Sequence, residues 1–303
     1  MQINYSFIIP HKNNPILLER CLASIPLRND IEIIVVDDNS CDAKKPLVTR
    51  CDTQIIFLDG KESKGPGNAR NVGLDKAQGK WVLFADSDDY YEKNFVEKLD
   101  AYKDSSYDMV FFDVFWAYSS NGTTGVKGKI YSKIIRAFLQ EPNDLHSICL
   151  KHFSNAVWSR MYLRAFIIKN NIRFLERMMG EDGCFVHYAS SLTNNVAAIQ
   201  DKIYYYVKNE SSLVNSSPTK QKILDGFYTG VKVRKHLVSE GCGIALGFQN
   251  HYFRSYLKVL KSMGVGFFFK YFLLHCRYDV SFFTMLYWKI KVYFLVKKWK
   301  NVE

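Results

Sequence analysis

The sequence predicts an α/β fold in which a largely parallel sheet is flanked by helices, followed by a helical extension at the C-terminus. Strand-like and helix-like stretches alternate over the first hundred residues, as they do in β-α-β units. The run IEIIVVDD at 31–38 is almost continuously β-branched up to its two aspartates, which is typical of a strand buried on both faces. After residue 224 the chain becomes basic, aromatic and helical in pattern. We therefore expect an α/β body that carries a chemically different tail.

The elements of the first hundred residues follow from local signals. The first helix has apolar residues at helical spacing, with Asn14 placed to cap it and Pro15 in its first turn. The first strand is stopped by Pro10, and the second helix is closed by Gly79. The expected order is strand 5–10, helix 14–25, strand 31–38, strand 53–59, helix 67–79 and strand 80–86.

Beyond residue 100 the pattern predicts a longer strand, short helices and two polar loops. The Ser/Asn-rich loop that ends at Pro218 is the best domain boundary in the chain, and the residues after it are helical in pattern. The expected elements are a strand at 107–118, a helix at 132–140, mostly helix at 157–175, a glycine-flanked loop at 180–183 and a strand that begins at 203.

Composition excludes several classes of protein. With 48% hydrophobic and 23% charged residues in 303, the chain is an ordinary globular protein. Its seven cysteines are scattered and never spaced as CxxC, which indicates reduced cytosolic thiols rather than disulfides or a zinc site. The N-terminus lacks the basic region of a signal peptide. Because no glycine precedes Gly60 and no GxxxxGK[ST] occurs, dinucleotide-binding Rossmann and P-loop sites are excluded.

An acidic cluster follows one of the predicted strands. In WVLFADSDDYY (81–91), Asp86, Asp88 and Asp89 come directly after an apolar run, and Asp37 and Asp38 end another strand. Ligands of α/β sheets bind at the carboxyl ends of strands, and clustered carboxylates repel unless a cation neutralises them. We therefore expect Mg²⁺ or Mn²⁺ at Asp88, with a diphosphate completing its coordination. The alternative is that Asp86 or Asp88 caps a helix that begins near Lys93.

Two further motifs could carry chemistry. In GPGNARNVG (65–73), glycines and a helix N-terminus favour an anion, and Arg70 could reach a phosphate or a base. The alternative there is an ordinary turn with a solvated arginine. In GED (180–182), Glu181 and Asp182 could provide a general base, although such a dipeptide is more often a solvent-exposed turn. We read three other polar residues, Asp113, His152 and His187, as structural or surface groups.

Five motifs together resemble family 2 glycosyltransferases with the GT-A fold, over roughly residues 4–215. They are SFIIPHKNN, IEIIVVDDNS, GPGNARNVG, WVLFADSDDYY and GED followed by IYYYVKNESSL. The similarity is to bacterial members that build capsule, O-antigen or exopolysaccharide chains. It implies a catalytic domain at 1–215, with a nucleotide-binding half at about 1–115 and an acceptor-binding half at about 116–215, and an extension at 216–303.

The resemblance implies an inverting, metal-dependent enzyme that transfers a hexose or N-acetylhexosamine. The donor would be a nucleotide-diphosphate sugar, a UDP-sugar in particular, and the acceptor a saccharide or lipid-linked saccharide. HKNN after Pro10 departs from the usual threonine–tyrosine–asparagine and puts the substrates in doubt. The implied roles are Pro10 in the nucleobase pocket, Asp38 at the base or ribose, Arg70 at the nucleotide, Asp86 at the ribose, Asp88 at the metal, and Asp182 with Glu181 as the catalytic acid pair.

The tail predicts where such an enzyme works. From residue 225 onward thirteen Lys and Arg oppose four Asp and Glu, so +9 of the net charge of +11 lies there. Within 264–300, the longest stretch without charge, 280–288, is too short to span a membrane. We expect helices that lie on an anionic membrane surface, which would make the protein peripheral on the inner face of the cell membrane; the alternative is a packed helical subdomain.

Two other functions stay open at this point, as does assembly into a homo-oligomer. A nucleotidyltransferase that forms the sugar nucleotide would need a glycine-rich loop after its first strand, and this chain has none there. A nucleic-acid-binding protein would account for the basic aromatic tail but not for the acidic cluster, so we expect no nucleic-acid partner.

Overall fold

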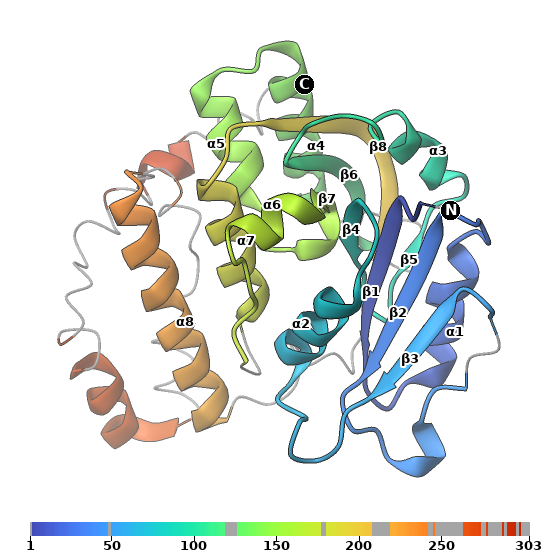
Figure 1. Cartoon of the computed structure of the whole chain (residues 1–303). Helices are drawn as coiled ribbons and strands as arrows, with labels where there is room; N and C mark the ends of the chain where they lie inside the picture. The colour runs from blue at the N-terminus through green and yellow to red at the C-terminus, as the bar shows by residue number, and fades with distance from the viewer. Residues whose placement is uncertain are drawn as a thin grey trace.

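The computed structural model describes residues 2–47, 50–118, 126–176, 180–207, 219–241, 245, 263–273, 277, 287, 290–294 and 297. Within these residues the chain forms one mixed sheet with helices packed around it (Figure 1). Much of the predicted extension at 216–303 lies outside the described residues, as does the loop that ends at Pro218.

Four parallel strands form the N-terminal part of the sheet. The continuous β-branched run of β2 is buried along nearly its whole length, as its composition predicts, and β1 lies between β2 and β4. The predicted strands are confirmed as β1 (Tyr5–His11), β2 (Ile31–Asp37), β3 (Thr53–Phe57) and β4 (Trp81–Phe84).

Two helices connect these strands. In α1 (Pro15–Ser24) Pro15 occupies the first turn as predicted, but the Asn14 side chain makes no capping hydrogen bond; instead the Asn14 N–H donates to His11 Nε2 over 3.1 Å. The second helix, α2 (Pro66–Lys76), packs on β1 and β2. It ends three residues before Gly79, where an added Cβ would lie only 2.6 Å from the Ser6 hydroxyl oxygen.

The sheet continues into the second half of the chain through an antiparallel strand. The order is β3-β2-β1-β4-β7-β6-β8-β5. Short β7 pairs antiparallel with β4 on one side and with β6 on the other, while β8 runs parallel to β6. The bounds are β5 (Tyr90–Tyr91), β6 (Met109–Tyr118), β7 (Arg160–Leu163) and β8 (Val196–Val207). The predicted division near residue 115 therefore falls inside β6.

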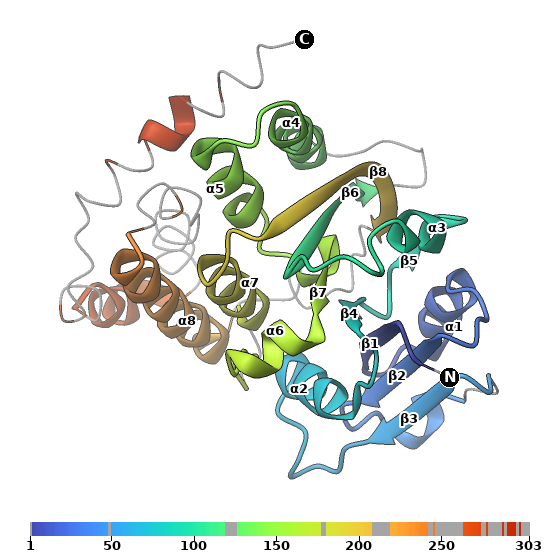
Figure 2. The same cartoon turned by 45° about the horizontal axis from the view of Figure 1, so that its top comes forward.

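Helices surround this second half. Figure 2 shows α4 beside α5 and α7 beside α8, in agreement with their contacts. The bounds are η1 (Asp42–Lys44), α3 (Phe95–Asp100), α4 (Val126–Gln140), α5 (Asp144–Phe153), η2 (Val157–Ser159), α6 (Arg164–Lys169), α7 (Glu181–Ser191) and α8 (Lys220–Ser239).

The helix predicted at 132–140 begins earlier, at Val126, and three predicted elements after residue 140 also differ in the structure. The segment 157–175 is not mostly helical, because it contains η2, β7 and the short α6; the open edges of β4 and β6 draw residues 160–163 into a strand, and such tertiary pairing overrides local propensity. The expected loop at 180–183 is the start of α7. The strand expected from 203 begins at Val196, and residues 208–218 lie outside the described residues.

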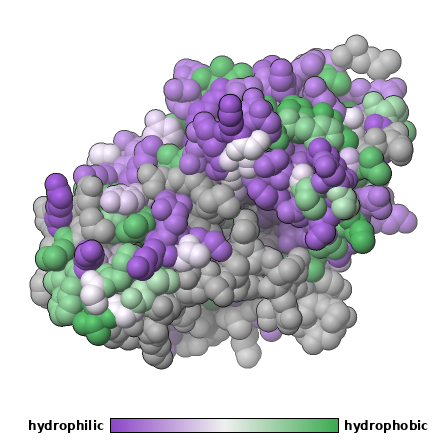
Figure 3. Space-filling model, turned by 90° about the horizontal axis from the view of Figure 1, so that it is seen from below, coloured by the Kyte–Doolittle hydropathy of each residue, from purple (hydrophilic) through white to green (hydrophobic). Residues whose placement is uncertain are grey.

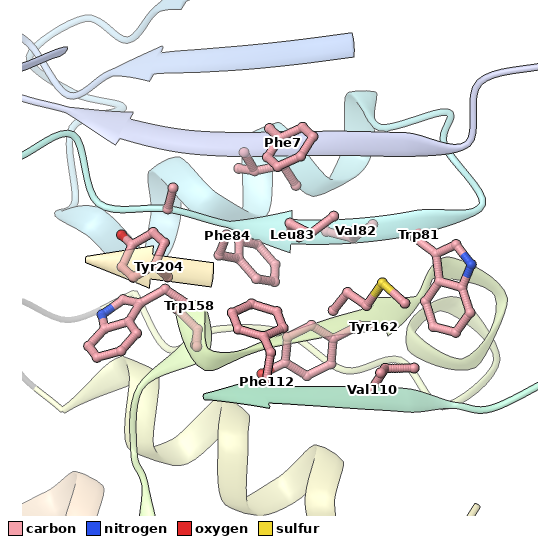
Figure 4. Close-up of a cluster of buried hydrophobic side chains, with 14 of the residues drawn as sticks. Phe7, Trp81, Val82, Leu83, Phe84, Val110, Phe112, Trp158, Tyr162 and Tyr204 are labelled. Atoms are coloured by element: carbon pink, nitrogen blue, oxygen red, sulfur yellow. The ribbon is translucent and has the colours of Figure 1, made fainter. Parts of the chain in front are cut away.

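The core around β4 is aromatic (Figure 4). Phe84 of β4 meets Tyr162 of β7 edge-on, with ring centroids 5.8 Å apart. Trp158 stacks on Tyr204 of β8 with centroids 5.1 Å apart. Edge-to-face and offset-stacked pairs of this kind add to the free energy of burial, so β4, β7 and β8 are held in one core behind the acidic cluster.

Among the described residues of 263–273, some side chains are buried against α8 and others are exposed to solvent. Tyr271 and Phe227 of α8 are buried in one small cluster, whereas Phe269 is 59% and Phe272 47% exposed. The surface seen from below mixes hydrophobic and hydrophilic side chains (Figure 3). Among the described residues there is no helix of the length and apolar character that crossing a membrane requires.

Candidate functional site

The carboxyl ends of the parallel strands bring the predicted acidic residues to one edge of the sheet. Pro10 lies near the end of β1 and pairs in register with Val36 of β2. Asp38 directly follows β2, and Asp86 follows β4 by two residues. Because β1 lies between β2 and β4, the three residues lie near one another at the carboxyl edge of the sheet, as the sequence predicts.

The two carboxylates at the end of β2 have different partners. Asp37 is fully buried, accepts hydrogen bonds from the Ser40 N–H at 2.9 Å and the Ser40 hydroxyl at 2.5 Å, and lies 2.7 Å from His11 Nδ1. Because His11 Nε2 accepts the Asn14 N–H, Nδ1 carries the proton and donates to Asp37. Asp38 has one oxygen 3.3 Å from Lys12 Nζ, while its buried Oδ1 has no hydrogen-bond partner among the described residues.

The two aspartates therefore differ in how many of their oxygens are hydrogen-bonded within the protein. Both oxygens of the Asp37 carboxylate are hydrogen-bonded, to His11 of β1 and to Ser40 after β2, and so hold the ends of these strands together. A buried acceptor without a donor is uncommon in proteins, and Asp38 Oδ1 is such an acceptor at the end of β2.

Three carboxylates converge in the turn after β4. Each of Asp86, Asp88 and Asp89 offers one oxygen such that the three oxygens lie within 4.8 Å of one another. Asp86 and Asp88 are partly exposed and Asp89 is buried. Burial, followed by the negative charges of Asp86 and Asp88, raises the pKa of Asp89 well above its usual value. The helix-cap alternative is wrong, because α3 begins at Phe95 and the residue that precedes it is Asn94.

A divalent cation fits this turn. Hard Mg²⁺ and Mn²⁺ take carboxylate oxygens and retain positions for phosphate oxygens. Asp88 and Asp86 are the exposed candidates, and the repulsion that raises the Asp89 pKa is of the kind that a bound cation relieves.

Asp89 is anchored by β8. The Tyr204 hydroxyl accepts a hydrogen bond from the Asp86 N–H at 3.0 Å and donates to Asp89 Oδ2 at 2.9 Å. The Val207 N–H donates to Asp89 Oδ1 at 2.8 Å. Sequence analysis missed Tyr204, because its partners lie more than a hundred residues away and no local signal marks them.

Arg70 joins the acidic turn to the predicted catalytic pair. One terminal nitrogen donates to Asp86 Oδ1 at 2.7 Å, and the other donates to Asp182 Oδ1 at 2.7 Å and to Glu181 Oε1 at 3.3 Å. The residue is 3% exposed, so the alternative of a solvated arginine is wrong. The structure thus brings Arg70, Asp86, Glu181 and Asp182 into direct contact.

Glu181 and Asp182 form the first turn of α7 instead of an exposed loop. Gly180 precedes them with a φ of 83°, a left-handed conformation that favours glycine. At Gly67, in the first turn of α2, an added Cβ would lie 2.2 Å from the Leu175 carbonyl oxygen and 3.0 Å from Glu181 Cγ. Glycine at that position lets α2 and the start of α7 approach closely, which is what allows Arg70 to reach both acids.

The protein environment raises the pKa values of both acids. For Asp182 burial is the main cause and raises the pKa well above its usual value, while the positive charge of Arg70 opposes the shift. The Asp182 side chain is still 29% exposed, so part of it lies at the protein surface. Burial also raises the Glu181 pKa against the opposing charge of Arg70. A carboxylate with a raised pKa and an accessible oxygen is suited to accept a proton.

The three residues read as structural or surface groups lie inside the protein, with Asp113 4% exposed and both histidines fully buried. His152 Nδ1 and His187 Nδ1 are 2.9 Å apart, and His187 Nε2 lies 2.8 Å from Asn155 Oδ1. Because Asn155 Oδ1 can only accept, His187 Nε2 carries the proton and His152 Nδ1 donates to His187. The surface alternative is therefore wrong for all three residues, and their structural role stays a prediction.

Comparison with known proteins identifies the family. The sequence model of glycosyl transferase family 2 matches residues 6–167, which is just over half of the chain. The chain belongs to glycosyl transferase family 2. The match contains Pro10, Asp38, Arg70, Asp86 and Asp88, and it ends before Glu181 and Asp182.

Family 2 relatives among curated proteins align with about two thirds of the chain. The poly(ribitol-phosphate) beta-N-acetylglucosaminyltransferase TarS of Staphylococcus aureus is 28% identical over 225 residues, covering 71% of this chain and 37% of TarS. The putative glycosyltransferase EpsH of Bacillus subtilis is 27% identical over 225 residues, covering 69% of this chain and 62% of EpsH. The chain thus aligns with less than two thirds of the length of either relative.

A solved structure shares the fold. The crystal structure of S. aureus TarS 1–349 superposes with a TM-score of 0.59 at 21% identity, covering 82% of this chain and 69% of that one. The same protein in complex with UDP-GlcNAc gives a TM-score of 0.58 at 22% identity, covering 76% and 66%. The predicted fold class is confirmed: this is a GT-A fold, with a mostly parallel sheet flanked by helices.

Proposed function

We propose that this protein is an inverting glycosyltransferase of bacterial surface-polysaccharide synthesis. It moves a hexose or N-acetylhexosamine from a nucleotide-diphosphate sugar, a UDP-sugar in particular, to a saccharide or lipid-linked saccharide. Family membership supports the reaction class, and a TarS complex with UDP-GlcNAc supports the donor class. A relative 42% identical over 90 residues, covering 28% of this chain and 29% of its own, is named GalNAc(5)-diNAcBac-PP-undecaprenol beta-1,3-glucosyltransferase in Campylobacter jejuni, which supports a lipid-linked acceptor.

One observation carries the proposal most directly. Donor-side carboxylates at the strand ends and an acid pair on α7 meet through a single buried guanidinium. This arrangement suits sugar transfer, because residues that bind the donor must lie close to a base that accepts the proton of the attacking hydroxyl.

In this proposal the donor binds at the carboxyl edge of β1, β2 and β4. Pro10 borders the nucleobase, Asp38 uses its unpartnered Oδ1 for the base or ribose, and Asp86 faces the ribose. Asp88 holds Mg²⁺ or Mn²⁺. When bound, the ion supplies positive charge that offsets the charge of the departing nucleoside diphosphate.

Asp182 then acts as the general base and Glu181 supports it. Its raised pKa and partial exposure equip Asp182 to remove a proton from an acceptor hydroxyl. The hydroxyl attacks the anomeric carbon from the face opposite the leaving group, so a single displacement inverts the configuration and one base suffices.

We also place the enzyme in the cytoplasm, peripheral on the inner face of the membrane. The charge of the last quarter of the chain and the exposed aromatic residues of 263–273 support this location, since basic and aromatic residues together favour anionic lipid surfaces.

The test is transfer itself. A panel of UDP-sugars is screened with Mn²⁺ by thermal shift, and the donor that binds is then assayed for UDP release with saccharide and lipid-linked acceptors. NMR of the product should show an inverted anomeric configuration. A nucleotidyltransferase would instead release pyrophosphate from UTP and a sugar 1-phosphate, and a nucleic-acid-binding protein would retain salt-dependent binding to nucleic acid without any turnover. Either result in place of transfer would refute the proposal.

A further inference from the structure

Arg70 donates its hydrogen bonds to protein side chains rather than to solvent. Its two terminal nitrogens contact three carboxylates that come from two distant parts of the chain, Asp86 after β4 and the acid pair of α7. The guanidinium also lies 5.5 Å from the centroid of the Phe174 ring. The side chain is 4% exposed, and Nε has no hydrogen-bond partner among the described residues.

The geometry leaves little of Arg70 for a nucleotide. Each terminal nitrogen already donates to a carboxylate at 2.7 Å, and only a small part of the side chain reaches the surface. The printed bonds use three of the five guanidinium N–H groups. The other two, Nε–H and one N–H of the nitrogen that contacts Asp86, belong to a side chain that is 4% exposed. A nucleotide could contact Arg70 only after the surrounding protein opened or one of these ion pairs broke, and breaking a buried ion pair is costly.

Electrostatics explains what the residue does instead. Asp86, Glu181 and Asp182 place three carboxylates around one guanidinium, and their mutual repulsion would drive them apart without it. A planar guanidinium with donors in a fixed fork can hold two carboxylates at a set spacing, which a lysine ammonium cannot.

We propose that Arg70 is a positioning residue, which fixes Asp182 relative to Asp86, and is not a ligand of the nucleotide. The proposal rests on the proposed function in one respect, since it takes Asp182 as the base. It revises the role that the family resemblance implies for Arg70.

The experiment separates binding from turnover. For Arg70→Lys and Arg70→Met we expect the Kd of UDP with Mn²⁺, measured by calorimetry, to stay within about threefold of wild type while kcat falls by roughly 10²-fold, the usual cost of a misplaced catalytic group. The lysine variant should retain more activity than the methionine variant, because it keeps one ion pair. Arg173→Met, which removes an exposed ion pair with Asp75, is the matched control and should change neither quantity. A large loss of UDP affinity with little loss of kcat would overturn the proposal and restore the nucleotide role.

Two further measurements keep the test decisive. If Arg70→Met does not fold, Arg70→Met combined with Glu181→Gln removes one of the uncompensated charges, and the same binding and turnover comparison applies. Amide hydrogen exchange of residues 181–185 should speed up by at least tenfold in Arg70→Met relative to Arg173→Met; unchanged exchange would overturn the positioning role. Because exchange needs no turnover, a wild-type protein that fails to transfer sugar would count against the proposed function alone.

Discussion

Tyr204 and Asp89 share a buried hydrogen bond of 2.9 Å although 115 residues separate them. The same hydroxyl accepts the Asp86 N–H at 3.0 Å, so one phenol fastens both ends of the acidic turn to β8. Asp89, the third carboxylate of the cluster, is thereby a structural group of the turn rather than an exposed ligand.

Replacing Tyr204 with Phe should weaken the site without unfolding the protein. The ring keeps its stacking on Trp158 and its edge contact with Tyr91, but the Asp86 N–H and Asp89 Oδ2 lose their partner. Groups left unpaired in this way cost about 1–3 kcal/mol. We expect urea unfolding to show a loss in that range and calorimetry to show weaker Mn²⁺-dependent UDP binding. Tyr102→Phe, which removes a hydroxyl bonded to the Ala198 carbonyl oxygen, controls for general stability and should leave UDP binding unchanged. Equal UDP affinity in the two variants would contradict the anchoring role.

Asp88→Asn should abolish Mn²⁺-dependent nucleotide binding. The neutral amide lacks the charge that holds a divalent ion beside two other carboxylates. Calorimetry with UDP in the presence of Mn²⁺ or EDTA measures the effect. Asp201→Asn, at an exposed ion pair with Lys98, is the control. If Asp88→Asn retains metal-dependent binding, the ligand assignment is wrong.

Asp182→Asn should retain donor binding and lower turnover by roughly 10²–10⁴-fold, the usual contribution of a general base. Glu181→Gln should have the smaller effect, because Glu181 is 6% exposed and only supports the pair. Steady-state kinetics with the donor found in the screen measures both. Near-normal turnover in Asp182→Asn together with an inactive Glu181→Gln would reverse the two roles.

The contribution of His152 to stability should fall as the pH drops below about 6.5, because this side chain must remain neutral in the folded protein, so we expect wild type to lose stability relative to His152→Asn. Its pKa is held well below the usual value by burial first, and then by electrostatic interaction with His187, Lys151, Arg160 and His236. The unfolded histidine binds a proton near pH 6.5 and the folded one does not, so stability is complete above that pH and declines below it, by at most about 1.4 kcal/mol per pH unit.

Urea unfolding at pH 7.5, 6.5 and 5.5 measures this decline. His152→Asn keeps a donor near the position of Nδ1 and should flatten the pH dependence. His146→Asn, at a histidine bonded to the Glu141 carbonyl oxygen on an exposed site, should leave the pH dependence as it is. Wild type and His152→Asn with the same pH dependence would contradict the assignment.

The exposed aromatic residues of the tail should contribute to membrane binding. Phe269→Ala with Phe272→Ala removes apolar area that is exposed in the structure, so we expect weaker sedimentation with anionic vesicles and unchanged UDP binding. Ile168→Ala, an exposed apolar residue of α6 that is 58% accessible, is the matched control. High salt should weaken wild-type binding without eliminating it, because charge attraction is screened and apolar insertion is not. Wild-type protein that ignores these vesicles at low salt would favour a packed subdomain.

The parallel half of the fold can be predicted from the sequence because each of its strands and helices is marked by residues within that same segment. The β-branched runs of β2 and β3, and the apolar run of β4, carry their own strand preference, and the parallel order follows from the intervening helices. Asp38, Asp86 and Asp88 could be placed at one edge for the same reason.

The second half depends on partners distant in sequence. Residues 160–163 become β7 because β4 and β6 each offer an unpaired edge, which the sequence RMYL does not reveal. The start of α7 looks like a loop because its two acids are flanked by glycines, although acids in the first turn of a helix are favoured by its dipole. The contacts of Arg70 with Glu181 and Asp182 could not be predicted for a related reason, because these partners lie 111 and 112 residues away.

Because the antiparallel strand β7 covers one edge of β4, the acidic site depends on residues from both halves of the chain. The residues predicted to hold the nucleotide all precede residue 90, yet β4 is an interior strand whose far edge is covered by residues 160–163, and the turn after it is tied to Tyr204 and Val207. A fragment ending near residue 115 would expose the edge of β4 and lack both anchors. During synthesis on the ribosome, we therefore expect the acidic turn to reach its final geometry only after residue 207 has left the exit tunnel. A gene fusion that exchanged the first half alone would transmit the acidic motif without the bonds that hold it in place.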